Sequence, residues 1–331
     1  MSIEGRSILR PPIVERDVMD ALSQIVRLVR LQASLDLRCQ FADGFSVDHE
    51  GAPPGEIEFH LVLAGRCVIE LPDESPVDMV GGDFLALRSG TPHRVRTVEA
   101  IDEHHRMSTT HAGSLPLKRS DTGETKLDLL CGRFNVDSTT MDQLLQTLPR
   151  LLHVSLSEST PDVHLHAIVA MMRTEVEVDS PGAVAIVEAL STVLLTLALR
   201  IHSRRDAISP SLLRLIGDTR MARATQAILA DPGRDWTLEQ LAGLSAMSRA
   251  TFARRFSEAS AMTPGALLLQ VRMSRAADLL TRSRRGVADV GVDVGYQSEA
   301  AFSKAFKRAM AMSPATYRRA RAGGDRGTCG E

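Results

Sequence analysis

The chain has 331 residues, 44% of them hydrophobic and 24% charged, which is enough for two domains that each bury a core. This composition is ordinary for a globular protein and excludes a fibrous or disordered one. The net charge is only −2, but residues 220–322 contain 17 Lys or Arg and 8 Asp or Glu, a balance of +9. A basic C-terminal segment on an acidic remainder predicts that one domain contacts a polyanion.

The chain shows no targeting signal at its start, because the first twenty residues lack the apolar segment of a signal peptide. Cys39, Cys67, Cys131 and Cys329 are far apart and have no CxxC or zinc-finger spacing. Both observations predict a reduced, cytoplasmic protein. The apolar stretch Ala183–Ile201 is about one bilayer thick as a helix, but it contains a glutamate and several hydroxyl side chains. We expect a buried packing or dimerisation helix there and no membrane partner.

The N-terminal part begins with a flexible arm, residues 1–16, followed by helical spacing of apolar residues over Asp17–Leu31. From Leu35 to about Phe134 the pattern changes to short β-type runs separated by Gly and Pro, which predicts a small barrel or sandwich. Residues 99–126 are polar and are expected to form a long loop. The strands that this pattern predicts include Ile57–Leu63, Cys67–Leu71, Val77–Val80, Phe84–Leu87, His93–Val98 and Leu127–Asp137.

From residue 141 onward the pattern is helical. Met141–Leu148 is a short predicted helix, and the short connection between Pro161–Val178 and Pro181–Arg205 predicts that these two helices are antiparallel. The fold class is therefore α+β, a β-barrel with a helical dimerisation segment followed by an all-α domain. The expected divisions are an arm over 1–16, a sensor and dimerisation domain over 17–205, a linker over 206–219, an all-α domain over 220–322 and a tail over 323–331.

The C-terminal region contains an internal repeat with a period of fifty residues, and a match of this extent is hard to obtain by chance. The repeat predicts two copies of one structural unit. The aligned pairs are Ser248 with Ser298, Phe252 with Phe302, Phe256 with Phe306, and Ala261–Pro264 with Ala311–Pro314.

The first copy has the features of a helix-turn-helix unit. Thr237 and Gln240 have the spacing of a capping box at the start of a supporting helix. Ser248 is positioned to cap a second helix, in which Phe252 and Phe256 lie four residues apart on one face. The phenylalanines anchor this helix on the core, so its basic opposite face is available for the DNA major groove.

The second copy repeats this arrangement. Val287–Val294 is the supporting helix, Gly295 is its left-handed terminator, and Ser298 caps the second helix. Between the copies, Thr263 and Pro264 start a long helix that separates the two units. For one copy alone, a helical bundle with a solvated charged face is an equal alternative; the repeat, the caps and the positive charge together favour DNA binding.

Residues 236–320 resemble the DNA-binding domain of the AraC/XylS family of bacterial transcription regulators, and the resemblance extends over the whole domain. It is found in Leu238–Ala242, Met247–Phe256, Arg272–Leu280, Val294–Arg308 and Ser313–Arg318.

The resemblance implies that base contacts come from the outward face of each second helix. The alanines on these faces offer only methyl contacts, so we expect Arg254 and Lys304 to dominate polar readout. Lys307 and Arg308 are expected to contact phosphates. The implied base-contacting residues are Arg249, Ala250, Ala253 and Arg254 in the first copy and Glu299, Ala300, Ser303 and Lys304 in the second.

Gly82–His93 resembles the second sequence motif of cupins, with an arginine in place of its proline. Glu58 lies seven residues before Gly65, as the acidic ligand of the first cupin motif does. Ala52 and Pro54 occupy the positions where that motif has two histidines. The resemblance implies a cupin-like barrel in the N-terminal domain.

Metal-binding cupins use three histidines and one glutamate, and by this motif the chain keeps at most Glu58, His93 and His60. Two or three ligands could hold a metal weakly, but we expect a barrel that has lost the metal, has no cofactor and keeps a pocket for a small-molecule effector.

Phe59–Leu71 and Leu130–Phe134, with the helices after them, resemble the cupin sensor of a branch of AraC-type regulators. Part of that branch responds to reactive chlorine or other oxidants through cysteine. The resemblance makes Cys39, Cys67 and Cys131 redox candidates, with buried packing as the alternative for each. The irregular spacing of His104, His105 and His111 favours solvated loop residues over metal ligands.

Together these features predict a sequence-specific transcription regulator, controlled by a small molecule or oxidant sensed in the N-terminal cupin domain. Its expected partners are double-stranded promoter DNA, a second copy of the chain and RNA polymerase. One alternative is a metal-dependent cupin enzyme with an accessory DNA-binding module, against which the missing histidines argue; we expect no catalytic residues. The other is an architectural DNA binder with steep salt dependence and little sequence preference.

Overall fold

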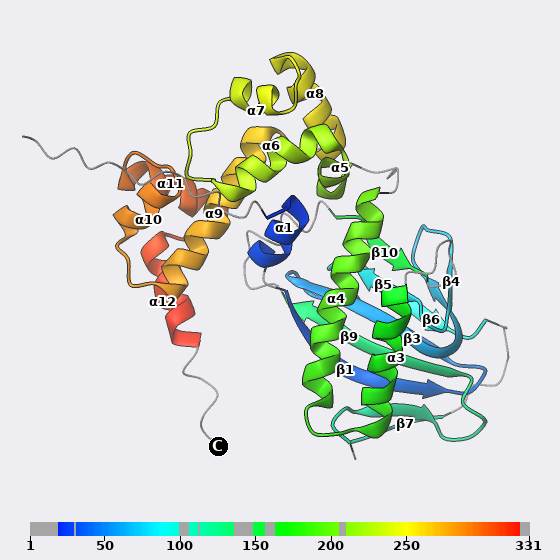
Figure 1. Ribbon diagram of the computed structural model, residues 1–331. Helices are drawn as coiled ribbons and strands as arrows, with labels where there is room; N and C mark the ends of the chain where they lie inside the picture. The colour runs from blue at the N-terminus through cyan, green and yellow to red at the C-terminus, as the bar shows by residue number, and fades with distance from the viewer. Residues whose placement is uncertain are drawn as a thin grey trace, which may run out of the picture.

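The computed structural model describes residues 19–29, 31–98, 106–111, 113–135, 148–155, 163–204 and 210–324 (Figure 1). The expected arm, the predicted helix before Leu148, His104, His105, Cys329 and all but the first two residues of the expected tail lie outside these residues. A curled β-sheet with two long helices on one face forms the N-terminal domain, and a group of helices forms the C-terminal domain.

The N-terminal sheet has the strand order β10-β5-β3-β9-β1-β8-β7, and β2, β4 and β6 complete it through β3. Strand β3 bends at Gly65, whose φ is +88°. A Cβ there would lie 1.8 Å from the Lys126 carbonyl oxygen, so only glycine fits. The strands are β1 (Gln32–Phe41), β2 (Ser46–His49), β3 (Glu56–Glu70), β4 (Val77–Val80), β5 (Phe84–Leu87), β6 (His93–Arg96), β7 (Met107–Thr110), β8 (Leu117–Ser120), β9 (Leu127–Asn135) and β10 (Leu151–Val154).

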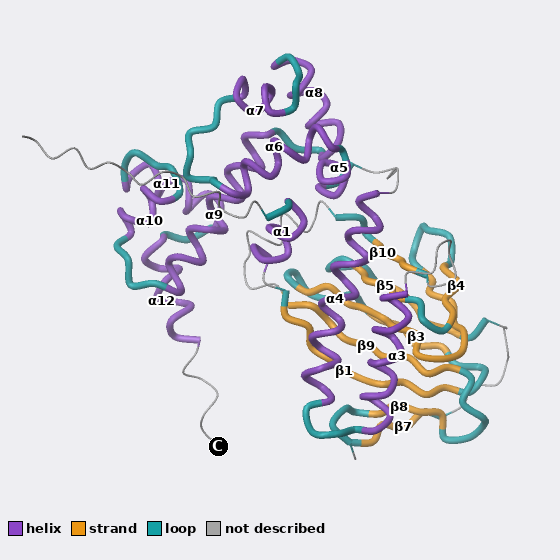
Figure 2. Tube along the Cα trace, viewed as in Figure 1, coloured by secondary structure: helices purple, strands orange, loops and turns teal. Residues whose placement is uncertain are grey.

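Three predictions about the strands were wrong. Leu151–Val154, in the region predicted to be helical, forms β10 and pairs with β5. Residues 56–70 form one long bent strand, where the sequence pattern predicted two. The expected loop over residues 99–126 contains β7 and β8, which pair with each other at the edge of the sheet (Figure 2). These short strands are polar and half-exposed, so they lack the apolar alternation that marks a strand in a sequence.

The sheet has two apolar faces because successive side chains of a strand point to opposite sides. Phe59, Leu61 and Leu63 point from β3 towards the helices, whereas Val62 points into the curled sheet. We call the space on that side the barrel interior; it also contains Cys131, from the neighbouring strand β9. The sheet therefore has a core under the helices and a separate core inside the barrel.

Helices α3 (Val163–Val178) and α4 (Ala183–Arg204) lie antiparallel across the sheet, as the short connection predicted (Figure 1). By length and composition α4 could cross a membrane. Its apolar character has another cause, because Val187, Leu194 and Ala198 are fully buried in the core beneath it. We therefore describe α4 as a packing helix.

The C-terminal domain is helical throughout, as predicted. The expected linker contains α5, a short helix with Leu212, Leu213 and Leu215 buried, so this segment is in part a packed element. The helices are α5 (Leu212–Gly217), α6 (Thr219–Ala230), α7 (Leu238–Leu244), α8 (Arg249–Ser260), α9 (Pro264–Arg282), α10 (Val287–Asp293), α11 (Glu299–Met310) and α12 (Pro314–Gly324).

Helix α1 (Ala21–Val29) connects the two domains. It contacts both α4 and α6 (Figure 1), and the side-chain amide of Gln226 in α6 donates to the Met19 carbonyl at 2.9 Å. One apolar core therefore extends from the sheet through α1 and α5 to α6, α8 and the first half of α9. The second half of α9 and helices α10, α11 and α12 form a core of their own.

Candidate functional site

The two helix-turn-helix units start their helices as the sequence predicted. Thr237 and Gln240 form a capping box at α7. The Ser248 hydroxyl accepts from the Thr251 amide at the start of α8, and the Ser298 hydroxyl accepts from the Ala301 amide at the start of α11. These caps define where each second helix begins. We call α8 and α11 the recognition helices.

One face of each recognition helix is anchored on a core. Phe252 and Phe256 of α8 and Phe302 and Phe306 of α11 are all 0% exposed. Their burial orients the opposite faces towards solvent, as the four-residue spacing predicted. On those faces the exposed predicted residues are Arg249, Ala250, Arg254, Glu299, Ala300, Lys304 and Lys307, and the half-buried ones are Ala253 and Ser303.

Arg254 lies on the exposed face of α8 and forms an ion pair with Glu258, with 3.2 Å between Nη1 and Oε1. Both side chains are more than half exposed, so the pair contributes little to stability and can open when a base or phosphate competes. A freely exposed arginine is suited to the bidentate contact with guanine.

The two helix-turn-helix units contact each other through the segment before α7, which Arg272 and Gly295 approach. Arg272 of α9 donates to the carbonyls of Pro232 and Arg234, which precede α7. Gly295, with φ at +87°, ends α10 as predicted, and a Cβ there would lie 2.5 Å from the Gly233 carbonyl oxygen. The two recognition helices are therefore held in a set relation by more than α9 alone.

Three histidines converge at one end of the barrel interior. His49 of β2 pairs with His93 of β6, and His60 of β3 has its Nε2 2.8 Å from Nε2 of His93. Each residue offers one ligand atom, and these atoms all lie within 4.8 Å of one another. We call His49, His60 and His93 the histidine cluster.

Burial governs the protonation of this cluster. It lowers the pKa of His49, lowers that of His60 strongly, and lowers that of His93 to about 4, with the neighbouring imidazoles acting in the same direction for His60 and His93. All three imidazoles are therefore neutral near pH 7.

The fixed hydrogen bonds around the cluster define its tautomers. His93 Nδ1 lies 3.2 Å from the Thr91 carbonyl oxygen, which only accepts, so Nδ1 is the protonated nitrogen of His93. Nε2 of His93 then accepts from Nε2–H of His60, and Nδ1 of His60, 3.2 Å from Sγ of Cys131, accepts from the thiol.

The structure differs from the cupin-motif expectation at two residues. His49 was missed, because it lies three residues before the position where the motif has a histidine. Glu58 is not part of the cluster; it accepts from the Ala52 amide, and burial raises its pKa. The motif therefore counted Glu58 with His60 and His93, whereas the structure groups His49 with these two histidines.

The three candidate redox cysteines described by the structure are all buried free thiols. A hydrogen bond with Cys39, together with burial, raises the pKa of Cys131 well above its usual value. Burial raises the pKa of Cys67 to about 12. Raised values disfavour the thiolate, the form that reacts with oxidants. Asp128, on the same strand as Cys131, forms an ion pair with Arg38 at 2.6 Å.

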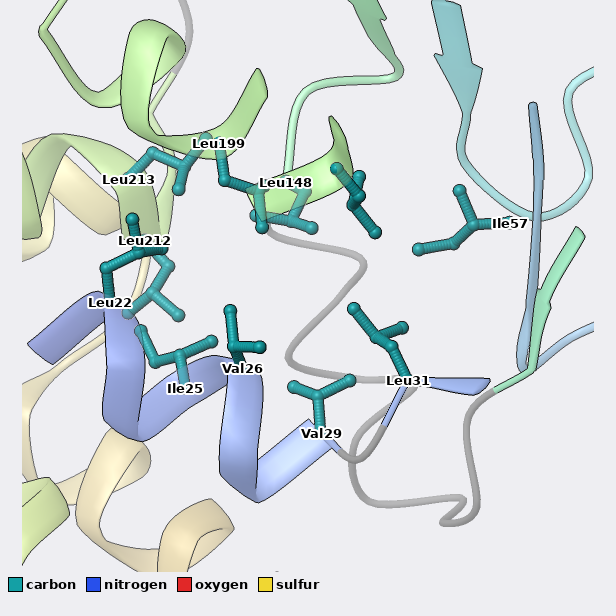
Figure 3. Close-up of a pocket in the computed structure, with 11 residues that line it drawn as sticks. Leu22, Ile25, Val26, Val29, Leu31, Ile57, Leu148, Leu199, Leu212 and Leu213 are labelled. Carbon is teal, nitrogen blue, oxygen red and sulfur yellow. The ribbon is translucent and has the colours of Figure 1, made fainter. Parts of the chain in front are cut away.

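A small apolar cavity lies where the two domains meet (Figure 3). Its volume is about 20 Å³, close to the space of a single water molecule, and an apolar lining keeps such a space dry. We call it the junction cavity. It is lined by Leu22, Ile25, Val26, Val29, Leu31, Ile57, Leu148, Leu195, Leu199, Leu212 and Leu213.

A cupin-like β-domain joined to a duplicated helix-turn-helix domain defines a two-domain, DNA-binding transcription regulator. The comparisons with known proteins agree with this class. A family profile described as Cupin matches residues 20–204, and one described as a helix-turn-helix domain matches residues 241–320.

Several curated relatives match along almost their whole length. An uncharacterised HTH-type transcriptional regulator of Haemophilus influenzae is 33% identical over 91% of this chain and 99% of its own. MtrA of Neisseria gonorrhoeae, an HTH-type transcriptional regulator, is 30% identical over 91% and 98%. The RCS-specific transcriptional activator RclR of Escherichia coli is 27% identical over 91% and 97%. The chain belongs to the AraC/XylS family of transcription regulators and to its members with a cupin N-terminal domain.

Proposed function

We propose that this regulator recognises promoter DNA through the outward faces of α8 and α11 and that the N-terminal domain controls how these faces meet DNA. The observation that supports the proposal most directly is the burial of four phenylalanines behind two exposed faces rich in small and basic residues. Such faces let the helix backbone approach the major groove while a few long side chains contact bases.

Within these faces we assign polar base contacts to Arg249, Arg254, Glu299 and Lys304, and methyl or short polar contacts to Ala250, Ala253, Ala300 and Ser303. Lys307 lies one turn further along α11 and is assigned to phosphate. The curated relatives are named as transcription regulators, in keeping with a non-enzymatic role.

The experiment is DNase footprinting and competition binding on a promoter library. Arg254→Ala should cost about 1–3 kcal/mol at one base position and relax the preference there. Arg255→Ala removes an exposed arginine from the same helix and is the matched control, expected to weaken binding uniformly and slightly. If no preferred site emerges, sequence-specific recognition is refuted; a uniform loss for Arg254→Ala reassigns that residue to phosphate.

We also propose that the protein acts as a homodimer through α3 and α4. Ile186 and Val193 of α4 are 40% and 43% exposed and lie seven residues apart on one face, and Met171 of α3 is 51% exposed. Dimerisation links two DNA-binding domains and raises avidity without new base contacts. Val193→Lys should shift the sedimentation of the full chain towards monomer, whereas Val292→Lys, the same change at a 67% exposed valine of α10, should not.

Control of DNA binding by a small molecule or oxidant is assigned to the N-terminal domain, and RNA polymerase remains the proposed output partner. The continuous core through α1 and α5 supports this route. The Ser211 amide, just before α5, donates to the Ala259 carbonyl in α8 at 2.8 Å. A shift of the sheet against α4 therefore reaches the first recognition helix through packed elements, whereas the second recognition helix belongs to a separate core.

A further inference from the structure

The histidine cluster has the composition of a transition-metal site. Its three imidazoles come from β2, β3 and β6, and their ligand atoms lie within 4.8 Å of one another. Imidazole nitrogen suits zinc, copper, nickel and iron ions, and three such ligands with a fourth position open are a common arrangement for zinc. We propose that His49, His60 and His93 bind one divalent transition-metal ion in the barrel interior of this regulator.

The second ring nitrogens of His60 and His93 have hydrogen-bond partners of the kind that orient metal-ligating histidines. His93 donates from Nδ1 to the Thr91 carbonyl, so its Nε2 carries no proton and has the lone pair that a metal ligand needs. Nδ1 of His60 faces Cys131 Sγ. When Nε2 of His60 binds the ion, the imidazole carries its proton on Nδ1 and donates it to that sulfur. Two of the three ligands are thus oriented through their second nitrogen.

Binding of an ion requires the ring nitrogens of His60 and His93 to move apart. Nε2 of His60 and Nε2 of His93 are 2.8 Å apart and are joined by the hydrogen bond that His60 donates. Two nitrogens bound at zinc–nitrogen distances of about 2.0–2.1 Å in tetrahedral geometry lie roughly 3.3 Å apart. The pair therefore separates by about half an ångström when the ion takes the place of this hydrogen bond and the His60 proton moves to Nδ1.

His49 must also turn. Its ring is stacked on that of His93, with centroids 4.5 Å apart and an angle of 10° between the planes, and stacked rings do not point their nitrogens at a common centre. Unlike His60 and His93, which are buried, His49 is half-exposed and has room to rotate.

An open hollow at this end of the barrel is lined by residues that include His49, His93, Glu50, Glu70 and Arg94. It gives the ion a path of entry and gives solvent or a small ligand access to the fourth coordination position. The three imidazoles are neutral ligands, and the carboxylates of Asp48 and Glu70 at this hollow are engaged by Arg94 and Arg96 at 2.6 and 2.7 Å. Because a bound dication keeps its charge, the fourth position favours an anionic ligand or hydroxide.

The site is placed to influence the domain junction. His60 and Ile57 belong to the same strand, and Ile57 lines the junction cavity beside α1. Movement of His60 on metal binding therefore acts on a strand that contacts the interdomain core. This regulatory consequence rests on the proposed function, whereas the metal site itself does not.

The test uses the full chain, purified in chelator and titrated with Co²⁺, whose visible absorption reports coordination geometry. We expect one equivalent per chain with a tetrahedral spectrum, displacement by Zn²⁺ and a higher thermal midpoint in the presence of metal. His49→Gln, His60→Gln and His93→Gln should each weaken binding at least tenfold. His166→Gln, an exposed histidine on α3, should bind as the parent does.

Thermal melts in chelator show whether each variant is folded, and His49→Gln, at the half-exposed rim, is the variant least prone to misfold. Failure of the parent to bind Co²⁺ stoichiometrically, or parental affinity in folded His49→Gln and His93→Gln, overturns the proposal. Footprinting of metal-free protein is read separately: a sequence-specific footprint without metal binding refutes the metal site alone, and metal binding without a footprint refutes the DNA assignment alone.

Discussion

Arg272 joins the two helix-turn-helix units, and its removal tests whether they act on DNA as one body. From the middle of α9 it donates through Nε to the Pro232 carbonyl at 2.7 Å and through Nη2 to the Arg234 carbonyl at 3.0 Å. Its guanidinium carbon also lies 5.8 Å from the ring centre of Tyr296, just before α11. The side chain therefore contacts segments that flank both units.

Replacing Arg272 with alanine removes two hydrogen bonds from a charged donor, each contributing about 1.5–3 kcal/mol. Because Arg272 is half-exposed, the low end of this range applies to each bond, and we expect a total loss of about 3 kcal/mol in the free energy of unfolding of this domain. Loss of the contacts that orient the second helix-turn-helix unit should weaken DNA binding about tenfold, which corresponds to about 1.4 kcal/mol of binding free energy.

The assay compares a DNA site that contains both recognition elements with one whose second element is scrambled. Arg272→Ala should weaken binding to the first DNA and leave the second nearly unchanged, and urea unfolding measures its stability. Arg275→Ala, exposed on the same helix, is the control and should affect neither. Equal losses on both DNAs, or no loss on either, would refute the idea that Arg272 aligns the two units.

Three further predictions follow from burial. Ile25→Ala enlarges the junction cavity and should lower the free energy of unfolding by about 2–5 kcal/mol and alter DNA affinity; unaltered affinity in the folded variant would separate α1 from the control of DNA binding. Cys67, with its pKa raised to about 12 by burial, should react with iodoacetamide at pH 8 about a thousandfold more slowly than a free thiol of pKa about 8.5; rapid labelling of the native protein would contradict its burial. The folded state holds the Cys67 proton above the unfolded pKa, so the free energy of unfolding should fall by up to about 1.4 kcal/mol per pH unit between about 8.5 and 12, and Cys67→Ala should lack this component.

Local signals in the sequence were sufficient for the two helix-turn-helix units. The caps at Thr237, Ser248 and Ser298 involve residues three positions apart, and the phenylalanine spacing reports one helical face directly. These patterns depend on short-range geometry, so the two recognition helices, their start points and their buried faces were all predicted before any tertiary contact was known.

The histidine cluster depends on strand pairing between residues far apart in the chain. His49 faces His93 only because β2 and β6 pair in that register, and His60 joins them from β3. The cupin motif defines ligands by their spacing along the chain. It therefore missed His49, which lies three residues before the motif position.

The sequence by itself determined the duplicated recognition helices and the antiparallel pair of helices, because periodicity and capping are local. Its resemblance to known families implied the cupin barrel and the class of protein. The tertiary structure alone decided that α1 and α5 join the sensor to the first recognition helix, that polar residues 107–110 and 117–120 form edge strands, and that three histidines share one end of the barrel. Each of these depends on long-range packing or strand register, for which a single sequence contains no periodic signal.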